Sequence, residues 1–367
     1  MNKNVLAIAI AAAVAAPSAF AAATVYGKIE TAVAQQDGIK TATGDASSLN
    51  VVSNSSRVGV KGSEDLGAGL KAIYQMEMAI NMDNGAGGLG NTLRDTFIGL
   101  NGGFGTVLLG KLDSPIKNAG RKYDLFRDQI GNTRNILATG GSVNAVDGRH
   151  GNVIAYATPK MGGFDALLAY VPGAAYEREQ NSKVNNKGDA YSAQLNFAAG
   201  AFDASLGYIN IGKTGTTPSV VGDAALANNF EAVRLGAGYT FGSAKVVALY
   251  QNDNTAKAIG LNGTRDTFGL GGSYKVTSAG TIKAQVYMAS KLGSSAALDK
   301  TGATLWNVGY DHAMSKNTTA YVSYALMDND TNGAYSVNLA GAGSGDSFLT
   351  RAGKDNSAVS VGLIHKF

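Results

Sequence analysis

The sequence offers few side chains suited to catalysis. Its imidazoles are His150, His312 and His365, and it contains no cysteine. A serine or threonine nucleophile needs a base within hydrogen-bond reach that is itself oriented by a third group. None of the three histidines lies in a recognisable nucleophile motif, and neither a Gly-rich phosphate loop nor a metal-ligand spacing is present. We therefore expect no enzyme, no cofactor and no metal site.

Charged residues are concentrated instead in one long segment, residues 113–150. Its charged members include Lys117, Arg121, Lys122, Asp124, Arg127, Asp128, Arg134, Asp147 and Arg149. A charged connection of this length is commonly a solvated surface. It could also narrow a passage, where fixed charges in a partly low-dielectric constriction select ions by their sign. The residues alone leave both interpretations open.

The surrounding elements alternate apolar and polar residues with a period of two. In residues 189–198, Tyr191 and Leu195 lie on one face, and Gln194 and Asn196 lie on the other. A second alternating run follows after a connection of only two residues, Ala199 and Gly200. This pattern predicts an antiparallel hairpin with a very short turn.

Runs of this kind recur along the whole chain. We predict sixteen strands, at residues 24–34, 55–62, 69–80, 93–101, 105–112, 151–158, 163–171, 189–198, 201–211, 229–241, 243–253, 265–276, 279–291, 301–313, 316–328 and 356–367. Long connections, among them 35–54, alternate with short turns, so the loops gather at one end of the sheet. Strand boundaries read from sequence shift by several residues, which leaves fourteen or eighteen strands as alternatives.

The polarity of the two strand faces indicates a membrane barrel. A soluble β-sandwich would turn polar faces outward, whereas here each strand carries an apolar stripe opposed to a polar one. In a closed barrel the apolar stripe faces lipid, and every backbone group is still hydrogen-bonded. The 49 glycines, 16 tyrosines and 5 prolines suit long strands with tyrosine at the membrane interfaces. We predict an all-β, transmembrane antiparallel barrel over residues 22–367.

The N-terminus has the features of an export signal. Lys3 precedes an apolar run at residues 5–16 that is too short to span a bilayer, and Ala19-Phe20-Ala21 has the spacing of a cleavage site. We expect residues 1–21 to be a cleaved signal peptide, with cleavage after Ala22 as the alternative. The formal charge of +4 is too small to indicate a nucleic-acid partner.

Three segments resemble a known family. Residues 56–77, beginning Ser-Arg-Val-Gly-Val-Lys-Gly, residues 95–105 and the C-terminal Val-Gly-Leu-Ile-His-Lys-Phe are similar to the Gram-negative general diffusion porins, most closely the neisserial and beta-proteobacterial type. The resemblance implies a homotrimer in the outer membrane, with about sixteen strands and a third loop folded into a water-filled pore for ions and small hydrophilic solutes. It also implies that Phe367 is part of the signal read by the barrel-assembly machinery.

The resemblance further implies where the pore is narrowest. The family's basic wall residues fall on Lys28, Arg57, Arg94 and Arg149, and its acidic loop positions fall on Asp124 and Asp128. Strand parity independently places Lys28 and Arg57 on polar faces. The acidic side departs from the family pattern, because the Pro-Glu-Phe-Gly motif of enterobacterial members is missing and Arg127 stands between the two acids. The basic excess predicts a moderate anion preference.

Two other assignments concern this pore. Lys61, Lys71 and Glu77 are secondary candidates, which could equally be solvated wall charges. A channel specific for one solute, or a purely structural barrel, is a further alternative. A sugar channel would need a row of aromatic side chains, and the third loop supplies only Tyr123 and Phe126.

Overall fold

The computed structural model describes residues 23–40, 44–83, 93–137, 146–172, 189–213, 218–219, 222–225, 228–258, 260–337 and 350–367. The predicted signal peptide, residues 1–21, lies outside this part of the chain and stays a prediction. No helix within the described ranges is long and apolar enough to cross a bilayer.

Strands make up most of the described chain. In order they are β1 (Thr24–Lys40), β2 (Asp45–Ser53), β3 (Arg57–Gly67), β4 (Leu70–Ala79), β5 (Thr96–Gly102), β6 (Gly105–Asp113), β7 (Arg149–Ala157), β8 (Phe164–Val171), β9 (Ala190–Ala199), β10 (Phe202–Ile211), β11 (Pro218–Ser219), β12 (Gly222–Ala225), β13 (Phe230–Phe241), β14 (Ala244–Asp253), β15 (Arg265–Lys275), β16 (Gly280–Ala289), β17 (Ala303–Ala313), β18 (Thr318–Asn329) and β19 (Asn356–Lys366). Short helices are α2 (Pro115–Arg121), α3 (Arg134–Leu137), α5 (Thr255–Ala258) and the 3-10 helix η1 (Ala296–Leu298).

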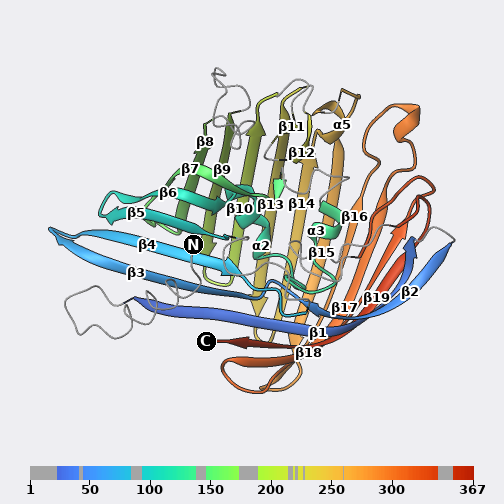
Figure 1. Ribbon diagram of the computed structural model, residues 1–367, viewed down its shortest axis with the longest axis horizontal. Helices are drawn as coiled ribbons and strands as arrows, with labels where there is room; N and C mark the ends of the chain where they lie inside the picture. Colours follow the sequence, from blue (N-terminus) through green and yellow to red (C-terminus); the bar gives the residue numbers. More distant parts are fainter. Residues whose placement is uncertain are drawn as a thin grey trace, which may run out of the picture.

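Seventeen of these strands form one closed antiparallel sheet (Figure 1). The terminal strands close it, since β1 pairs with β19 from Lys28 opposite Lys366 to Asp37 opposite Ser357. On its other side β1 pairs first with β3 and then with β2, so β2 and β3 are two halves of one wall strand. The described chain therefore forms a sixteen-stranded barrel, as predicted. The small hairpin β11–β12 is a separate sheet.

The prediction of a loop at residues 35–54 is wrong. β1 continues to Lys40 and pairs with β2 across a bulge between Gln36 and Ile39. Gly38 lies in this bulge with φ +81°, a conformation that glycine adopts without a steric penalty. The alternation also continues in β2, whose Leu49 and Val51 point outward and are exposed. The wall is consequently taller here than the sequence pattern suggested.

The predicted parity of the wall is confirmed. Leu195 is 45% exposed on the outer face, whereas its neighbour Gln194 is 6% exposed on the inner face. The same alternation leaves large apolar side chains outside on neighbouring strands, including Leu206, Leu235, Phe268, Leu270, Ile282, Trp306, Val308 and Val361. A continuous apolar outer surface of this kind is stable in lipid and would be unstable in water.

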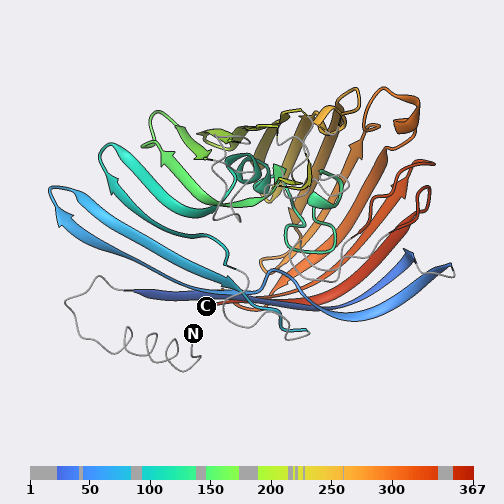
Figure 2. The ribbon, with the colours of Figure 1, turned by 45° about the horizontal axis from the view of Figure 1, so that its top comes forward.

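The third long connection folds into the barrel. Figure 2 shows α2 and α3 inside the ring of strands, where α2 packs against β9, β10 and β13. Ser114 caps α2 by accepting a hydrogen bond from the Lys117 amide, and Pro115 occupies the first turn, where a missing N–H is tolerated. Ile116 and Phe126 of this connection are fully buried. The inward third loop predicted above is therefore confirmed.

Glycines on the inner wall make room for this loop. A β-carbon on Gly236 of β13 would lie 2.0 Å from the ring of Tyr123, and one on Gly207 of β10 would lie 2.8 Å from the β-carbon of Ala119. Both distances are far below van der Waals contact. The wall and the third loop therefore pack directly on each other, and the loop's place depends on these two glycines.

Candidate functional site

A cavity of about 370 Å³ lies between the third loop and the facing barrel wall. It is lined by charged side chains from β6, β7, β13, the segment before β5, and the third loop. The basic ones are Arg94, Lys111, Lys117, Arg121, Arg127, Arg134, Arg149 and Arg234, and the acidic ones are Asp124, Asp128 and Asp147. The described part of this lining thus carries eight basic groups and three acidic ones. It includes four of the six predicted constriction residues.

The other two predicted residues, Lys28 and Arg57, reach the cluster through Asp128. The Lys28 Nζ atom donates to Asp128 at 2.9 Å and also contacts Glu30 on its own strand. The Arg57 guanidinium lies 3.9 Å from the same Asp128 carboxylate. Although burial works against ionisation, the adjacent Lys28, Arg127 and Arg57 hold the pKa of Asp128 well below its usual range. Asp128 therefore carries a full negative charge that faces the basic wall.

Glu77 joins two of the predicted arginines. Its carboxylate accepts a hydrogen bond from the Arg94 Nε atom at 2.5 Å and lies 3.7 Å from the Arg57 Nε atom. Tyr26 donates a further hydrogen bond to it at 2.9 Å. Glu77 was a secondary candidate in the sequence and is an ion-paired member of the cluster.

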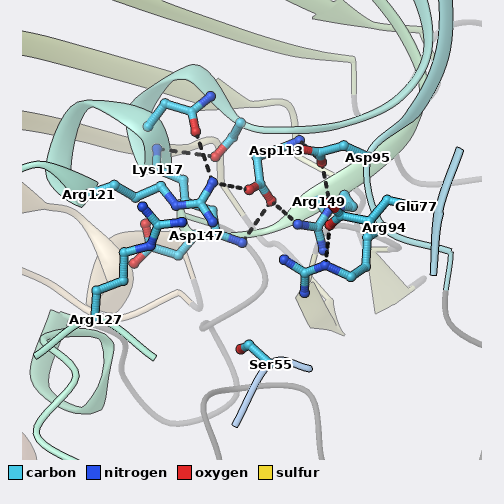
Figure 3. Close-up of polar contacts among 12 residues, drawn as sticks. Ser55, Glu77, Arg94, Asp95, Asp113, Lys117, Arg121, Arg127, Asp147 and Arg149 are labelled. Carbon is cyan, nitrogen blue, oxygen red and sulfur yellow. Dashed lines mark hydrogen bonds and ion pairs between the residues drawn. The ribbon is translucent and has the colours of Figure 1, made fainter. Parts of the chain in front are cut away.

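Arg149 and Asp113 form the centre of a second group of ion pairs (Figure 3). Arg149 bonds Asp95 at 2.6 Å and lies 2.9 Å from Asp113. Asp113 also accepts hydrogen bonds from Lys117 at 2.8 Å and from Arg121 at 2.6 Å. Three cations thus surround one buried carboxylate, and the local charge is positive.

The two predicted loop acids have different environments. Asp124 accepts hydrogen bonds from the Phe126 amide at 3.0 Å and from the Thr133 amide and hydroxyl, both at 3.1 Å. The Gln285 side chain of β16 adds a fourth at 3.3 Å. These contacts hold the loop in its turn and against the wall. Asp124 thus stabilises the fold of the loop through hydrogen bonds, while Asp128 forms ion pairs with the basic wall.

Two wall arginines that the sequence interpretation missed anchor the third loop. Arg234 of β13 bonds Asp147 at 2.7 Å, and Arg265 of β15 donates to the Ile136 and Leu137 carbonyls at 2.9 and 2.5 Å. Both are almost fully buried. A signal was available for Arg234, because it occupies the inward parity of its strand between two small residues, Ala232 and Gly236. Small neighbours on the same face leave space for a loop to approach.

Phe367 lies at the seam that closes the barrel. Its backbone exchanges two hydrogen bonds with Gly27 of β1, at 2.9 and 3.2 Å. A β-carbon on Gly27 would lie 2.3 Å from the ring of Phe367, so the terminal ring packs against this glycine. The last residue is thus part of the seam between the first and last strands.

Comparison with known proteins agrees with this geometry. The family model described as Gram-negative porin matches residues 7–332. The chain is 32% identical to outer membrane porin protein 32 of Delftia acidovorans over the whole of both chains, and 28% identical to the major outer membrane protein P.IB of Neisseria lactamica, again over the whole of both. Among solved structures it is similar to the anion-selective porin from Comamonas acidovorans, with 28% identity, a TM-score of 0.75 and coverage of 95% of this chain and 100% of that one. The chain belongs to the Gram-negative porin family: it is an outer-membrane β-barrel through which ions and small hydrophilic solutes diffuse.

Proposed function

We propose that this porin prefers anions, and that Lys28, Arg57, Arg94 and Arg149 on the wall, with Asp128 on the third loop, set this preference at the constriction. The charged side chains that line the cavity, together with the wall charges that form ion pairs with them, number ten basic and seven acidic in the described part of the chain. The excess is three positive charges. The acids added to the lining set are Glu30, Glu77, Asp95 and Asp113. Charges of this number in a narrow passage raise the local concentration of the opposite ion.

The arrangement of the charges carries the proposal. Arg127 and Arg121 have side chains that are 40% and 24% exposed, whereas the carboxylates of Asp113 and Asp147 are each only 2% exposed. Asp113 and Asp147 are therefore covered by their basic partners, and Arg127 and Arg121 are among the side chains that a passing ion can reach. Asp95 and Asp128 keep partial exposure, which limits the preference to a moderate one. The anion-selective porin named above, which has the same fold at 28% identity, also supports this proposal.

The direct test is the reversal potential of the purified porin in a planar bilayer with a potassium chloride gradient. We expect the sign of an anion-preferring channel, and a preference that weakens as salt rises, because exposed charges are screened over roughly 8–10 Å at physiological salt. Replacing Arg57 and Arg149 together by Ser should shift the potential toward that of a cation-preferring channel. The matched control replaces Lys257 and Lys300, which are exposed on outer connections. Cation preference in the unmodified protein, or equal shifts in both double variants, would refute the assignment.

We also propose that the mature protein begins after residue 21 and assembles as a homotrimer. OmpT of Vibrio cholerae, which shares 16% identity and the fold with a TM-score of 0.62, has been described in a trimer form. Light scattering of the detergent-solubilised protein should give the mass of three barrels, and mass spectrometry should give the mass of residues 22–367. We propose no enzymatic activity, because the family is one of channels.

A further inference from the structure

Arg265 is a buried arginine on the barrel wall whose donors are all used. It is 1% exposed, and its Nε and Nη2 atoms donate to Asp253 at 3.0 and 2.7 Å. Its remaining hydrogens go to the carbonyls of Ile136 and Leu137 at 2.9 and 2.5 Å, and to the hydroxyl of Tyr335 at 3.2 Å. A guanidinium has five N–H groups in a fixed plane, so every one has a partner here.

Two of these partners belong to the third loop. Ile136 and Leu137 end the short helix α3, whose last carbonyls have no acceptor role within the helix. Gln251 of β14 donates a second hydrogen bond to the Leu137 carbonyl, at 3.1 Å. A cation at a helix C-terminus is also electrostatically favourable. Arg265 therefore holds the middle of the third loop against the wall.

The last partner, Tyr335, comes from the connection between β18 and β19. Tyr335 and Val337 are 8% and 0% exposed, so this stretch of an outer connection is folded inward. Its backbone is held by side-chain amides from three neighbouring wall strands. Asn329 and Asn356 both donate to the Tyr335 carbonyl at 2.9 Å, and Gln36 donates to the Val337 carbonyl at 2.8 Å. The stretch is thus built into the interior.

The contacts continue from the middle of the third loop to its end. Asp253 accepts a hydrogen bond from Gln251 at 3.0 Å, and Gln251 accepts one from Arg234 at 2.9 Å. Arg234 in turn bonds Asp147. One hydrogen-bonded chain, running across β15, β14 and β13, therefore links the last outer connection to both the middle and the end of the third loop.

We infer that Arg265 is a positioning residue through which the last outer connection, by the hydroxyl of Tyr335, keeps the third loop fixed in the pore. This inference goes beyond the proposed ion preference, because it concerns how long the pore stays open and not which ion enters. Buried hydrogen-bond networks strengthen one another and fix one arrangement when every member is satisfied. Removing one member should leave the charges of the pore lining unchanged, while allowing the loop to detach from the wall and obstruct the pore more often.

Tyr335→Phe is the sharpest test, since it removes one hydroxyl and keeps the ring. In single-channel recordings we expect closures at a given voltage to become about tenfold more frequent, the effect of losing one hydrogen bond to a charged group. The reversal potential should not change. The closure rate therefore tests the role of Arg265 and Tyr335, whereas the reversal potential tests the proposed ion preference, and either can fail without the other. Hydrogen–deuterium exchange of residues 130–137 should be faster in the variant.

Two further variants keep the inference falsifiable. Tyr250→Phe is the matched control, because the Tyr250 hydroxyl donates to Asp266 at 2.7 Å outside this network. Arg265→Lys keeps the charge beside Asp253 but not the planar set of donors, so it should act in the same direction. The double variant with Arg265→Lys and Tyr335→Phe should have the same closure rate as Arg265→Lys alone, since both substitutions act on one contact. Equal closure rates for Tyr335→Phe and Tyr250→Phe, or effects that simply add, would overturn the inference. If Arg265→Lys does not fold, the closure rate and exchange of Tyr335→Phe still decide it.

Discussion

The Lys28 Nζ atom of the first strand lies 2.9 Å from a carboxylate oxygen of Asp128, 100 residues further along the chain. This ion pair joins the barrel wall to the third loop at the point where the pore is lined mainly by basic groups. Asp128 also has φ +65°, a conformation that Asp and Asn tolerate better than most residues. Replacing Asp128 by asparagine therefore removes one negative charge while the backbone can keep its conformation.

Asp128→Asn should strengthen the anion preference. The substitution removes the acid that neutralises Lys28 and approaches Arg57, and asparagine keeps the shape and the left-handed backbone. The anion-to-cation permeability ratio should rise about sevenfold, since one charge in a water-containing passage changes the energy of an anion and of a cation by roughly RT each, in opposite directions. The reversal potential measures this ratio. Asp299→Asn, at an exposed acid paired with Lys291, is the control, and an equal response of both variants would contradict the prediction.

The anion preference should fall as pH rises through 7, because burial lowers the pKa of Lys117 to about 7 although Asp113 opposes this shift. Below that pH the ammonium adds to the charges of Arg121, Arg134 and Arg149, and above it this contribution is lost. The unfolded lysine binds its proton up to its ordinary pKa of 10.5, so the contribution of Lys117 to the free energy of unfolding rises with pH between about 7 and 10.5.

Reversal potentials of the wild type and Lys117→Met, measured at about pH 6 and pH 8, test this pH dependence. His150 interacts electrostatically with Lys117, so both measurements are made in a His150→Gln background, in which this histidine cannot contribute to the difference. The wild type should lose anion preference at the higher pH, and the variant should show a smaller change. Identical pH profiles would show that Lys117 does not titrate in the pore.

Gly236→Ala should displace the third loop. The added methyl group would lie 2.0 Å from the Tyr123 ring, and the ring cannot retreat without moving the loop. We expect a lower single-channel conductance and a free energy of unfolding reduced by about 1–3 kcal/mol, the usual range for overpacking. Gly272→Ala is the matched control on the same sheet, because the nearest atom to its new methyl group is 3.7 Å away. Wild-type conductance and stability in Gly236→Ala would mean that the loop is not packed on this glycine.

Cysteine labelling can check which face of the wall meets water. The chain has no cysteine, so each single replacement by cysteine is labelled without background from other thiols. In intact membranes, a water-soluble thiol reagent that enters the pore should modify Asn196→Cys at least about tenfold faster than Leu195→Cys, because adjacent residues of a strand face opposite sides. Asn196 is preferred to Gln194 because its side chain is less covered. Equal rates would reverse the assignment of the inner and outer faces.

Deletion of Phe367 should lower the amount of folded protein in the outer membrane. The deletion removes two backbone hydrogen bonds to Gly27 and the ring that packs on it. Phe367→Tyr keeps both features and should assemble normally. The yield of heat-modifiable protein in isolated outer membranes is the measurement. A wild-type yield after deletion would exclude a role for this residue in assembly.

Much of the barrel could be predicted from the sequence because its determinants are local. A strand alternates its side chains with a period of two whatever its partner is, so Leu195 and Gln194 could be assigned to opposite faces without a structure. Turn glycines act locally as well: Gly200 and Gly242, both with φ +57°, begin the short turns of two predicted hairpins. The same local pattern failed at residues 35–54, where the strands continue through a bulge.

The contacts inside the pore were decided only by the tertiary structure. Closing the barrel and folding the third loop inward bring together charges that lie far apart in the sequence, such as Lys28 with Asp128 and Arg234 with Asp147. No periodic pattern records which acid a buried arginine will meet, because the partner is chosen by distance in space and by the need to satisfy every buried donor. The sequence by itself thus determined the wall, its two faces and the presence of a basic loop. The tertiary structure decided that Asp113 and Asp147 are buried among basic side chains and that Arg265 links two loops.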